Sequence, residues 1–324
     1  MNRVEIIGTG SYLPENVVTN DDLNKVVDTS DEWIKTRTGI RQRRISKGEG
    51  TSEMASKAAL KAIENSGVSA DEIDFIITAT ATPDDFIPST ACIVQKNIGA
   101  VNATCFDISA ACSGFIYAMD IGTQFIKSGR AKTILIIGAE TLSKILDWKD
   151  RSTCILFGDG AAAAILRKGD RNNVLSVLTG SNGFLGDALV CEALPVNNPY
   201  IEGEVKKTFS VVKMDGKEIF RFAVKIMEKV IKELLKQTES SIDEVKCIVP
   251  HQANLRIIEA ASKRLNVSAD KFYVNLDKYG NTSAASVGIA FDEVMKKCDL
   301  KKGDKIILVG FGGGLTYGGV FIQV

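Results

Sequence analysis

The sequence predicts an α/β fold made of two similar halves, and three observations lead to this prediction. Short β-branched segments alternate with longer amphipathic ones, which is typical of buried sheets covered by helices. At 324 residues the chain is longer than one hydrophobic core usually supports. In a single ungapped register, "DEIDFII" at 71 aligns with "DEVKCIV" at 243, and "TILIIG" at 133 aligns with "KIILVG" at 305. We therefore expect an internal duplication, with halves at 1–172 and 173–324 that share one core.

The expected elements follow this alternation along the chain. Compact runs of Ile, Val and Phe predict strands, and apolar residues that recur every three to four positions predict helices. Gly67 and Gly129 stand where helix C-caps belong. The Asp-Gly pair in "FGDGAAAA", which starts at 157, predicts a tight hairpin turn. In chain order, strands are expected at 4–7, 74–78, 105–108, 133–137, 247–249 and 305–309, and helices at 52–66, 113–128, 218–236, 255–265 and 284–297.

Composition excludes several classes of function. Lys plus Arg equals Asp plus Glu at 40 each, so no overall charge favours a nucleic acid or a membrane surface as partner. No apolar run approaches the about 18 residues of a membrane span, and the N-terminus lacks the apolar core of a signal peptide. Seven scattered cysteines without a CxxC pair indicate free thiols in a reducing cytoplasm. A single histidine argues against a structural zinc site, and we expect no metal.

Cys112 is the first candidate functional residue. In "DISAACSGF" it stands between an apolar strand and an amphipathic helix, surrounded by Ala, Ser and Gly. A cysteine at a helix start is usually a core residue. The N-terminal end of a helix nevertheless favours a thiolate, and the small neighbours leave room for a substrate carbonyl. The pattern therefore favours a nucleophile.

Two further candidates lie in the second half of the chain. His251, in "CIVPHQANLRI", follows a strand that Pro250 ends, and carboxyl ends of strands in α/β sheets face the usual ligand crevice. Asn281 lies in "GNTSAAS", a small-residue turn that the repeat aligns with the Cys112 turn. Considered singly, each is more often structural. The repeat makes the two turns counterparts, and symmetric halves would bring them face to face.

These motifs together resemble a known family. "DISAACSGF", "VPHQANLRI", "GNTSAAS" and "GFGGGLTYGG", with "TSDEWIKTRTGIRQRR" at 29 and "DRSTCILFGDGAAAA" at 150, resemble the β-ketoacyl-acyl carrier protein synthase III enzymes of the thiolase superfamily. The resemblance implies the five-layered α-β-α-β-α thiolase fold, a homodimer, and initiation of type II fatty acid synthesis. It implies acyl-CoA and malonyl-acyl carrier protein as partners, and no cofactor. Elongating relatives need two histidines and thiolases a second cysteine in the last glycine loop, and neither is present here.

The resemblance also implies roles for individual residues. Cys112 would be acylated, His251 and Asn281 would stabilise the enolate of the malonyl thioester, and the N–H groups of Cys112 and Gly313 would form the oxyanion hole. Gln252, Thr282 and Ser283 would support these groups rather than react. The residues that resemble CoA contacts are Trp33, Arg37, Arg151, Gly216 and Asn254, and those that resemble carrier-protein contacts are Arg221, Arg256, Lys263 and Arg264.

Two questions stay open at the level of sequence. Ile87, in "DDFIPST", falls where some relatives carry an aromatic residue that caps the partner's acyl pocket, so the primer could be wider than acetyl. A starter condensing enzyme of polyketide or other secondary metabolism would share the fold and the Cys-His-Asn triad. A non-enzymatic dimeric scaffold is the remaining alternative, and it fits poorly with an intact set of catalytic residues.

Overall fold

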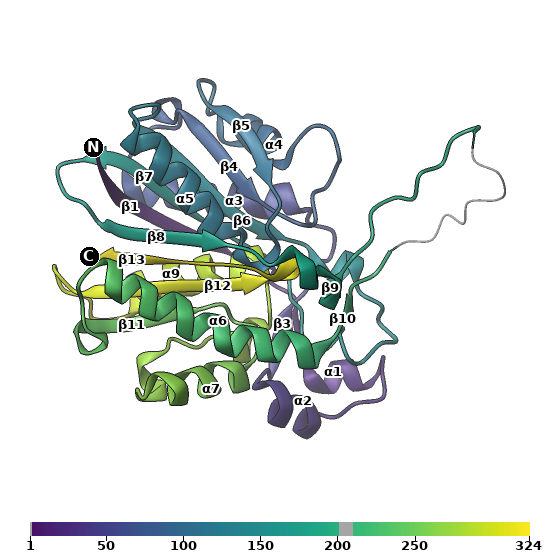
Figure 1. Cartoon of the computed structure of the whole chain (residues 1–324). Coiled ribbons are helices and arrows are strands. Elements are labelled where there is room, and N and C mark those ends of the chain that lie inside the picture. Colours follow the sequence, from purple (N-terminus) through teal and green to yellow (C-terminus); the bar gives the residue numbers. More distant parts are fainter. Residues whose placement is uncertain (1, 201–209) are drawn as a thin grey trace.

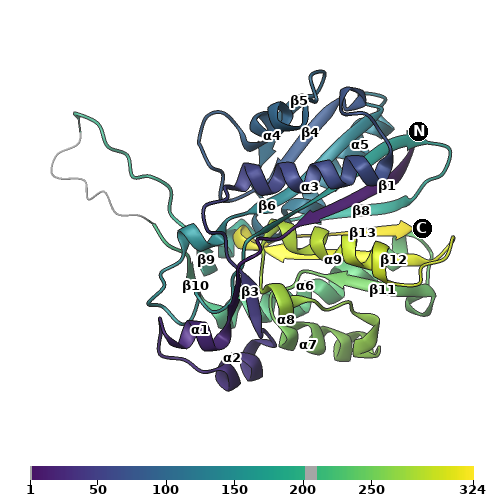
Figure 2. The same cartoon turned by 180° about the vertical axis from the view of Figure 1, so that it is seen from behind.

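The fold consists of two β-sheets between three layers of helices. The computed structural model describes residues 2–200 and 210–324. Figure 1 and its reverse view, Figure 2, show one sheet above the other, with α5 (Gly114–Lys127) and α9 (Ala284–Lys297) between them. α3 (Thr51–Ser66) covers the outer face of the first sheet, and α6 (Gly216–Gln237) that of the second. The expected α/β fold with two similar halves in five layers is confirmed.

The first sheet is mixed. Its strand order is β1-β7-β6-β4-β5. β4 pairs in parallel with both β5 and β6, whereas β7 is antiparallel to β1 and β6. The strands are β1 (Arg3–Tyr12), β4 (Phe75–Ala79), β5 (Thr104–Ile108), β6 (Thr133–Glu140) and β7 (Gly160–Gly169).

The second sheet repeats this arrangement without an equivalent of β5. Its order, β11-β12-β13-β8, matches β4-β6-β7-β1 strand for strand. The strands are β8 (Val174–Gly180), β11 (Val245–Pro250), β12 (Lys305–Gly312) and β13 (Thr316–Gln323). The register that aligns 71 with 243 in the sequence also places β6 on β12 end to end, and it places the capping box Ser69–Glu72 on a second one, Ser241–Glu244. The chain passes from one sheet to the other between residues 169 and 174.

The remaining elements are shorter or lie at the periphery. No helix of the described residues has the length and apolar character needed to cross a membrane. The other helices are α1 (Asn20–Asn24), α2 (Asp31–Thr38), α4 (Thr90–Ile98), α7 (Leu255–Leu265) and α8 (Leu276–Tyr279). The other strands are β2 (Val17–Thr19), β3 (Gln42–Arg44), β9 (Leu189–Val190) and β10 (Lys213–Met214). The 3-10 turns are η1 (Ala70–Glu72), η2 (Ala111–Ser113), η3 (Leu142–Ile145), η4 (Gly183–Ala188), η5 (Ile242–Glu244), η6 (Ala269–Lys271) and η7 (Gly313–Leu315).

Three large apolar clusters join the layers. The central one packs α5 and α9 against the inner faces of both sheets, with Phe115 and Phe291 among its fully buried members. A second cluster joins α3 and α4 to the first sheet, and a third joins α6 and α7 to the second. The third also contains Leu23, Ile34 and Ile40. The segment around α1 and α2 thus belongs to the first half in sequence and packs on the second half in space.

The prediction of a tight hairpin turn at "FGDGAAAA" is wrong. Gly160 begins β7, and β6 reaches β7 through residues 141–159 rather than through a short turn. Asp159 is fully buried, where its carboxylate accepts hydrogen bonds from the Ser143 N–H and hydroxyl at 2.9 and 2.7 Å and from the Ser46 N–H at 2.8 Å. The aspartate therefore ties two loops together, a role that no local pattern indicates.

Candidate active site

Cys112 lies at the N-terminal end of α5, in the centre of the molecule. It is the middle residue of η2, which precedes α5 directly. Its small neighbours serve packing between the halves: a Cβ at Gly114 would stand 2.7 Å from the Ala79 Cβ and 3.3 Å from the Ala284 Cβ. The residues around the sulfur are therefore small because α5, β4 and α9 pack closely at this point.

The last glycine loop holds the other side of Cys112. A Cβ at Gly312 would stand 2.6 Å from the Cys112 nitrogen, closer than real side chains approach, so glycine is required there. The Thr316 hydroxyl contacts the Ala110 carbonyl at 3.0 Å and the Ser113 hydroxyl at 3.1 Å. The end of β12 and the start of β13, both in the second half, thus fix the nucleophile turn of the first.

His251 follows β11 and is 2% exposed. Its ring lies edge-on to Phe311 at 5.0 Å between ring centroids, and its Nδ1 is 2.5 Å from the Ser286 hydroxyl oxygen. Because that oxygen already accepts the Gln252 N–H at 3.4 Å, the hydroxyl proton is free to point at Nδ1. This arrangement favours the tautomer that carries its proton on Nε2. Burial lowers the pKa of His251 to about 3, so the imidazole is neutral at pH 7.

Asn281 is held by both halves. Its N–H donates to the Leu156 carbonyl at 2.8 Å, and its own carbonyl accepts the Gly158 N–H at 3.0 Å. The side-chain Oδ1 accepts the Ser283 N–H at 2.8 Å. With Oδ1 engaged, the amide nitrogen remains available to donate toward the cavity.

The three candidates line one cavity. Cys112, His251 and Asn281 border a small cavity of about 120 Å³ together with Gly216 and Asn254. The last two residues also border an open groove of about 1120 Å³. The residues predicted from three distant motifs therefore converge on one sulfur at the end of a passage to the surface.

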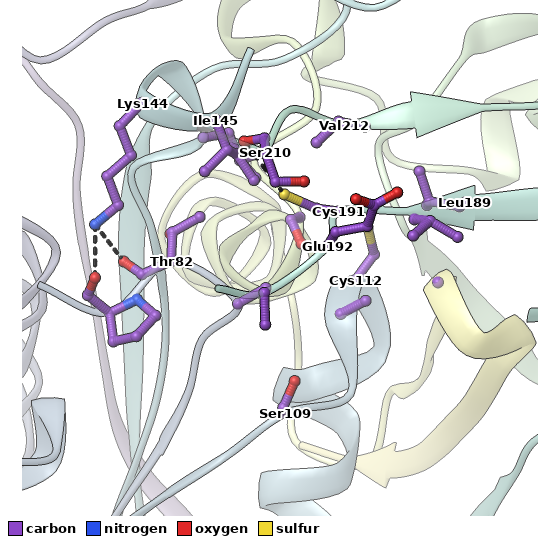
Figure 3. Close-up of a pocket in the computed structure, with 18 of the residues that line it drawn as sticks. Thr82, Ser109, Cys112, Lys144, Ile145, Leu189, Cys191, Glu192, Ser210 and Val212 are labelled. Atoms are coloured by element: carbon purple, nitrogen blue, oxygen red, sulfur yellow. Dashed lines mark hydrogen bonds between the residues drawn. The ribbon is translucent and has the colours of Figure 1, made fainter. Parts of the chain in front are cut away.

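A second cavity opens on the other side of Cys112. It has about 760 Å³. Apolar Leu142, Phe157 and Leu189 border it near Cys112, and the charged residues Asp84, Asp85, Lys144 and Glu192 border it as well. Figure 3 shows Cys112 beside Leu189, with Lys144 across the cavity donating to the carbonyls of Thr82 and Pro83 at 2.8 Å each. This space suits an apolar group attached to the sulfur.

The expected thiolate is not the favoured form of Cys112 in this environment. Burial raises the pKa of the Cys112 thiol to about 12, and the nearby Glu140 charge acts in the same direction. The helix start alone predicted the opposite shift. Sequence inspection sees the helix end but not the loss of water around the sulfur.

The predicted CoA contacts form two groups. Two guanidinium groups contact the Trp33 ring, with the Arg37 and Arg151 Cζ atoms 4.8 and 5.1 Å from its centroid. Gly216 and Asn254 lie deeper, where the groove meets the small cavity. Arg37 borders the same groove.

The four predicted carrier-protein contacts are separated by the structure. Arg221 and Arg256 border the groove, together with Lys213 and Lys217. Lys263 and Arg264, in the last turn of α7, are exposed but do not border it. The Arg264 Nε is 2.5 Å from the Glu228 carboxylate on α6. These basic residues of the groove therefore come from β10, α6 and the start of α7.

Ile87 does not border its own chain's cavity. Its side chain is 88% exposed, and the neighbouring Phe86 is 78% exposed although it borders the large cavity. Among the described residues, no group of three or more His, Cys, Asp or Glu side chains is arranged to hold a metal ion.

Sequence analysis missed two polar side chains near the site. Ser286, which contacts His251, lies in the quoted "GNTSAAS" turn, and its place in the first turn of α9 was a usable signal. Glu140, the last residue of β6, is fully buried close to Cys112. Its position after an apolar strand carries no distinguishing pattern.

Comparison with known proteins gives consistent matches along the chain. Residues 106–183 match the family described as 3-oxoacyl-[acyl-carrier-protein (ACP)] synthase III, and residues 235–324 match its C-terminal part. The chain is 67% identical over 324 residues to the beta-ketoacyl-[acyl-carrier-protein] synthase III of Clostridium kluyveri, covering 100% of both. The crystal structure of 3-oxoacyl-[acyl-carrier-protein] synthase III from Aquifex aeolicus VF5 is similar with a TM-score of 0.92 and 48% identity, covering 99% of this chain and 100% of that one. The priming beta-ketosynthase from the R1128 polyketide pathway has a TM-score of 0.92 and 34% identity, covering 100% and 97%.

Proposed function

The chain belongs to the 3-oxoacyl-[acyl-carrier-protein] synthase III family, and from that membership we propose how its own residues carry out the reaction. The enzyme is a condensing acyltransferase that joins a short acyl-CoA to malonyl-acyl carrier protein and so initiates type II fatty acid synthesis. The observation that supports our assignment of residues is the convergence of Cys112, His251 and Asn281 on one cavity.

In the first half-reaction, Cys112 attacks the acyl-CoA carbonyl. The sulfur–carbonyl bond forms as the carbonyl–CoA sulfur bond breaks, and the thiol proton leaves with CoA as its new thiol. The tetrahedral oxyanion would be stabilised by the N–H groups of Cys112 and Gly313, and both residues border the cavity of about 760 Å³. The acyl chain would extend into that cavity, past Leu142 and Phe157.

In the second half-reaction, the malonyl thioester loses CO2. Negative charge then collects on the thioester oxygen as an enolate, which needs hydrogen-bond donors. Neutral His251 would donate from Nε2, because Ser286 occupies its Nδ1, and Asn281 would donate from its amide nitrogen. The carbanion attacks the acyl group on Cys112, the thiolate leaves, and a 3-oxoacyl thioester forms. We propose no metal or cofactor for either step.

The groove would admit both thioester substrates. Trp33, Arg37 and Arg151 would bind the adenine and phosphates of CoA, and Gly216 and Asn254 would line the path of the pantetheine arm. Carrier proteins are acidic, so the rim formed by Arg221 and Arg256 would dock them. Lys263 and Arg264, one turn or more away, would add long-range attraction rather than contact.

We also propose that the protein works in the cytoplasm as a homodimer with halves at 1–172 and 173–324. β5 is an edge strand of the first sheet and is open to pairing. Several large apolar side chains are exposed, as expected for a surface that a second copy covers. They are Phe86, Ile87, Phe184, Leu194, Val196 and Tyr200. Ile87 would then cap the acyl cavity of the partner.

Separated half-reactions test these assignments. We expect Cys112→Ala to abolish both acylation and condensation, and His251→Ala or Asn281→Ala to leave acylation of Cys112 from acyl-CoA intact while abolishing malonyl decarboxylation. Mass spectrometry of the acyl-enzyme and release of labelled CO2 give the two readouts. Retained condensation in Cys112→Ala, or loss of acylation in a folded Asn281→Ala protein, would contradict the assignment.

A starter enzyme of polyketide synthesis is not favoured. The relative at 67% identity is named for the fatty acid enzyme, whereas the polyketide priming enzyme is 34% identical. The primer is the open part of the proposal. Ile87, which falls where some relatives carry an aromatic residue, favours acceptance of branched four- and five-carbon groups besides acetyl. Acylation rates with acetyl-, isobutyryl- and isovaleryl-CoA measure this directly.

A further inference from the structure

Arg43 is a buried cation that the proposed reaction does not use. It is the middle residue of β3, and its side chain is fully buried. Among the described residues it forms no ion pair, because its hydrogen bonds go to neutral oxygens of Val18, Asn20 and Ile155, and its Nε has no partner there. A buried charge without a counter-ion lowers the stability of a folded protein. A position with no other role would therefore favour an apolar side chain of similar size.

The guanidinium joins two segments that lie far apart in the sequence. Its Nη2 donates to the Ile155 carbonyl at 2.7 Å, and its Nη1 donates to the Asn20 Oδ1 at 2.9 Å and to the Val18 carbonyl at 3.2 Å. Asn20 is itself fixed, since its amide nitrogen donates to the Ile40 carbonyl at 2.8 Å. Hydrogen bonds from a charged donor are about twice as strong as neutral ones. Arg43 thus holds the carbonyl of residue 155 against a rigid support.

The stem of Arg43 packs where the segment 155–158 meets Asn281. The backbone of Asn281 pairs with this segment as an isolated parallel bridge, through hydrogen bonds of 2.8 and 3.0 Å. A Cβ at Gly158 would stand 3.2 Å from the Arg43 Cβ, and a Cβ at Gly280 would stand 3.4 Å from it. The side chain of Arg43 therefore contacts both partners of the bridge.

A displacement of the segment 155–158 would be transmitted directly to the Asn281 amide. Gly280 has a φ of +65°, and a Cβ there would stand 2.7 Å from the Leu156 carbonyl oxygen, so no side chain separates the two backbones. The Asn281 Oδ1 is fixed by the Ser283 N–H at 2.8 Å. The amide nitrogen therefore moves with the backbone of its own turn.

We propose that Arg43 is a positioning residue of the condensation: its guanidinium fixes the segment 155–158, and this segment sets the place of the Asn281 amide that donates to the enolate. The inference rests on the proposed role of Asn281. Arg43 is not among the residues that border the cavities around Cys112, so it acts through the backbone and not on the substrate.

This role predicts an effect on one half-reaction only. Asn281 is proposed to donate during malonyl decarboxylation, whereas acylation depends on Cys112 and its oxyanion hole. The turn of Cys112 is held by Gly312 and Thr316, and neither contact involves Arg43. A general loss of structure would instead slow both half-reactions.

Arg43→Met tests the inference, because methionine fills much of the same space without a charge or a donor. We expect malonyl decarboxylation about tenfold slower, since a small misplacement of a transition-state donor is costly. Acylation of Cys112 at saturating acyl-CoA and the KM for malonyl-acyl carrier protein should be unchanged. Arg43→Lys keeps a charged donor but lacks the planar fork that reaches Asn20 and Ile155 together, and it should slow decarboxylation about threefold. Release of labelled CO2 and mass spectrometry of the acyl-enzyme give the two rates.

The neighbouring arginine of β3 provides a matched control. The Arg44 guanidinium donates to the carbonyls of Pro14 and Glu15 at 3.3 and 3.2 Å, so Arg44→Met should leave both half-reactions unchanged. Unchanged decarboxylation in Arg43→Met, equal slowing of both half-reactions, or the same selective loss in Arg44→Met would overturn the proposal. If Arg43→Met does not fold, Arg43→Lys decides by the same criteria. Retained decarboxylation in Asn281→Ala would instead refute the proposed function.

Discussion

The neutrality of His251 makes a quantitative prediction about stability. It is the only histidine of the chain, so between pH 7.5 and 5 it is the one side chain whose ordinary pKa lies inside the interval. Burial lowers the pKa of His251 from 6.5 to about 3. When the pH is lowered to 5, the imidazole of the unfolded chain takes up a proton and that of the folded chain does not. The folded state is therefore expected to lose stability as the pH falls.

The size of the loss follows from linkage. A pH of 5 is about 1.5 units below the pKa of the imidazole in the unfolded chain, and each unit corresponds to a free energy of about 1.4 kcal/mol. His251 should therefore cost the folded state about 2 kcal/mol at pH 5 relative to pH 7.5, and the loss should continue down to the folded pKa. Glu140 and Asp159 act in the opposite direction, because burial raises their pKa values and their folded forms gain protons first.

Urea unfolding of the wild type and of His251→Asn at both pH values isolates the imidazole. All other groups cancel in the difference between the two proteins, so the free-energy difference should change by about 2 kcal/mol between pH 7.5 and 5. NMR of the single imidazole provides an independent check, since its Cε1–H resonance should not titrate above pH 5. A titration midpoint near 6.5 in the folded protein, or a constant free-energy difference, would refute the assignment of a neutral histidine.

Three further predictions concern the shape and the rim of the site. Gly312→Ala places a Cβ 2.6 Å from the Cys112 nitrogen and should lower the unfolding free energy by about 1 to 3 kcal/mol, whereas Gly313→Ala, with no contact closer than 3.4 Å, should cost about 0.5 kcal/mol or less in thermal or urea denaturation. Ser286→Ala frees the Nδ1 of His251 from its partner and should slow malonyl decarboxylation about tenfold with acylation of Cys112 unchanged; equal slowing of both half-reactions would contradict its role in orienting the imidazole. Arg256→Glu should raise the KM for malonyl-acyl carrier protein about tenfold at low salt and less at high salt. Lys263→Glu, which lies outside the groove, should raise this KM by less. A larger increase of KM for Lys263→Glu than for Arg256→Glu in steady-state kinetics would contradict the prediction.

The architecture was accessible from the sequence because it repeats. One register aligns β6 with β12 and the two capping boxes with each other. The strands and helices with strong apolar periodicity were found within a few residues of their observed ends. β7 was missed because its four consecutive alanines lack β-branched character and follow an Asp-Gly pair. The packing of α1 and α2 on the second half depends on Leu23, Ile34 and Ile40, whose local pattern does not reveal their partner.

The candidate residues of the site were easier to predict than their protonation. Cys112, His251 and Asn281 stand at strand ends and small-residue turns, which are positions that the sequence marks. Whether Cys112 is a thiol and His251 is neutral depends on burial among residues from both halves, and no short motif contains that information. The same holds for Arg264, whose ion pair with Glu228 forms between two helices.

The repeat also clarifies why each half holds only part of the site. Cys112 corresponds to Ala284, Asn281 to Ser109 and His251 to Ala79, so each reactive side chain has a small residue as its counterpart. At the shared interface both sets of turns converge, and two full sets of side chains would compete for one volume. Gly312 leaves space beside the Cys112 nitrogen, whereas the corresponding position of the first half is Glu140, which has a large side chain. Divergence of the halves therefore favours a single reactive site, at the turn that carries Cys112.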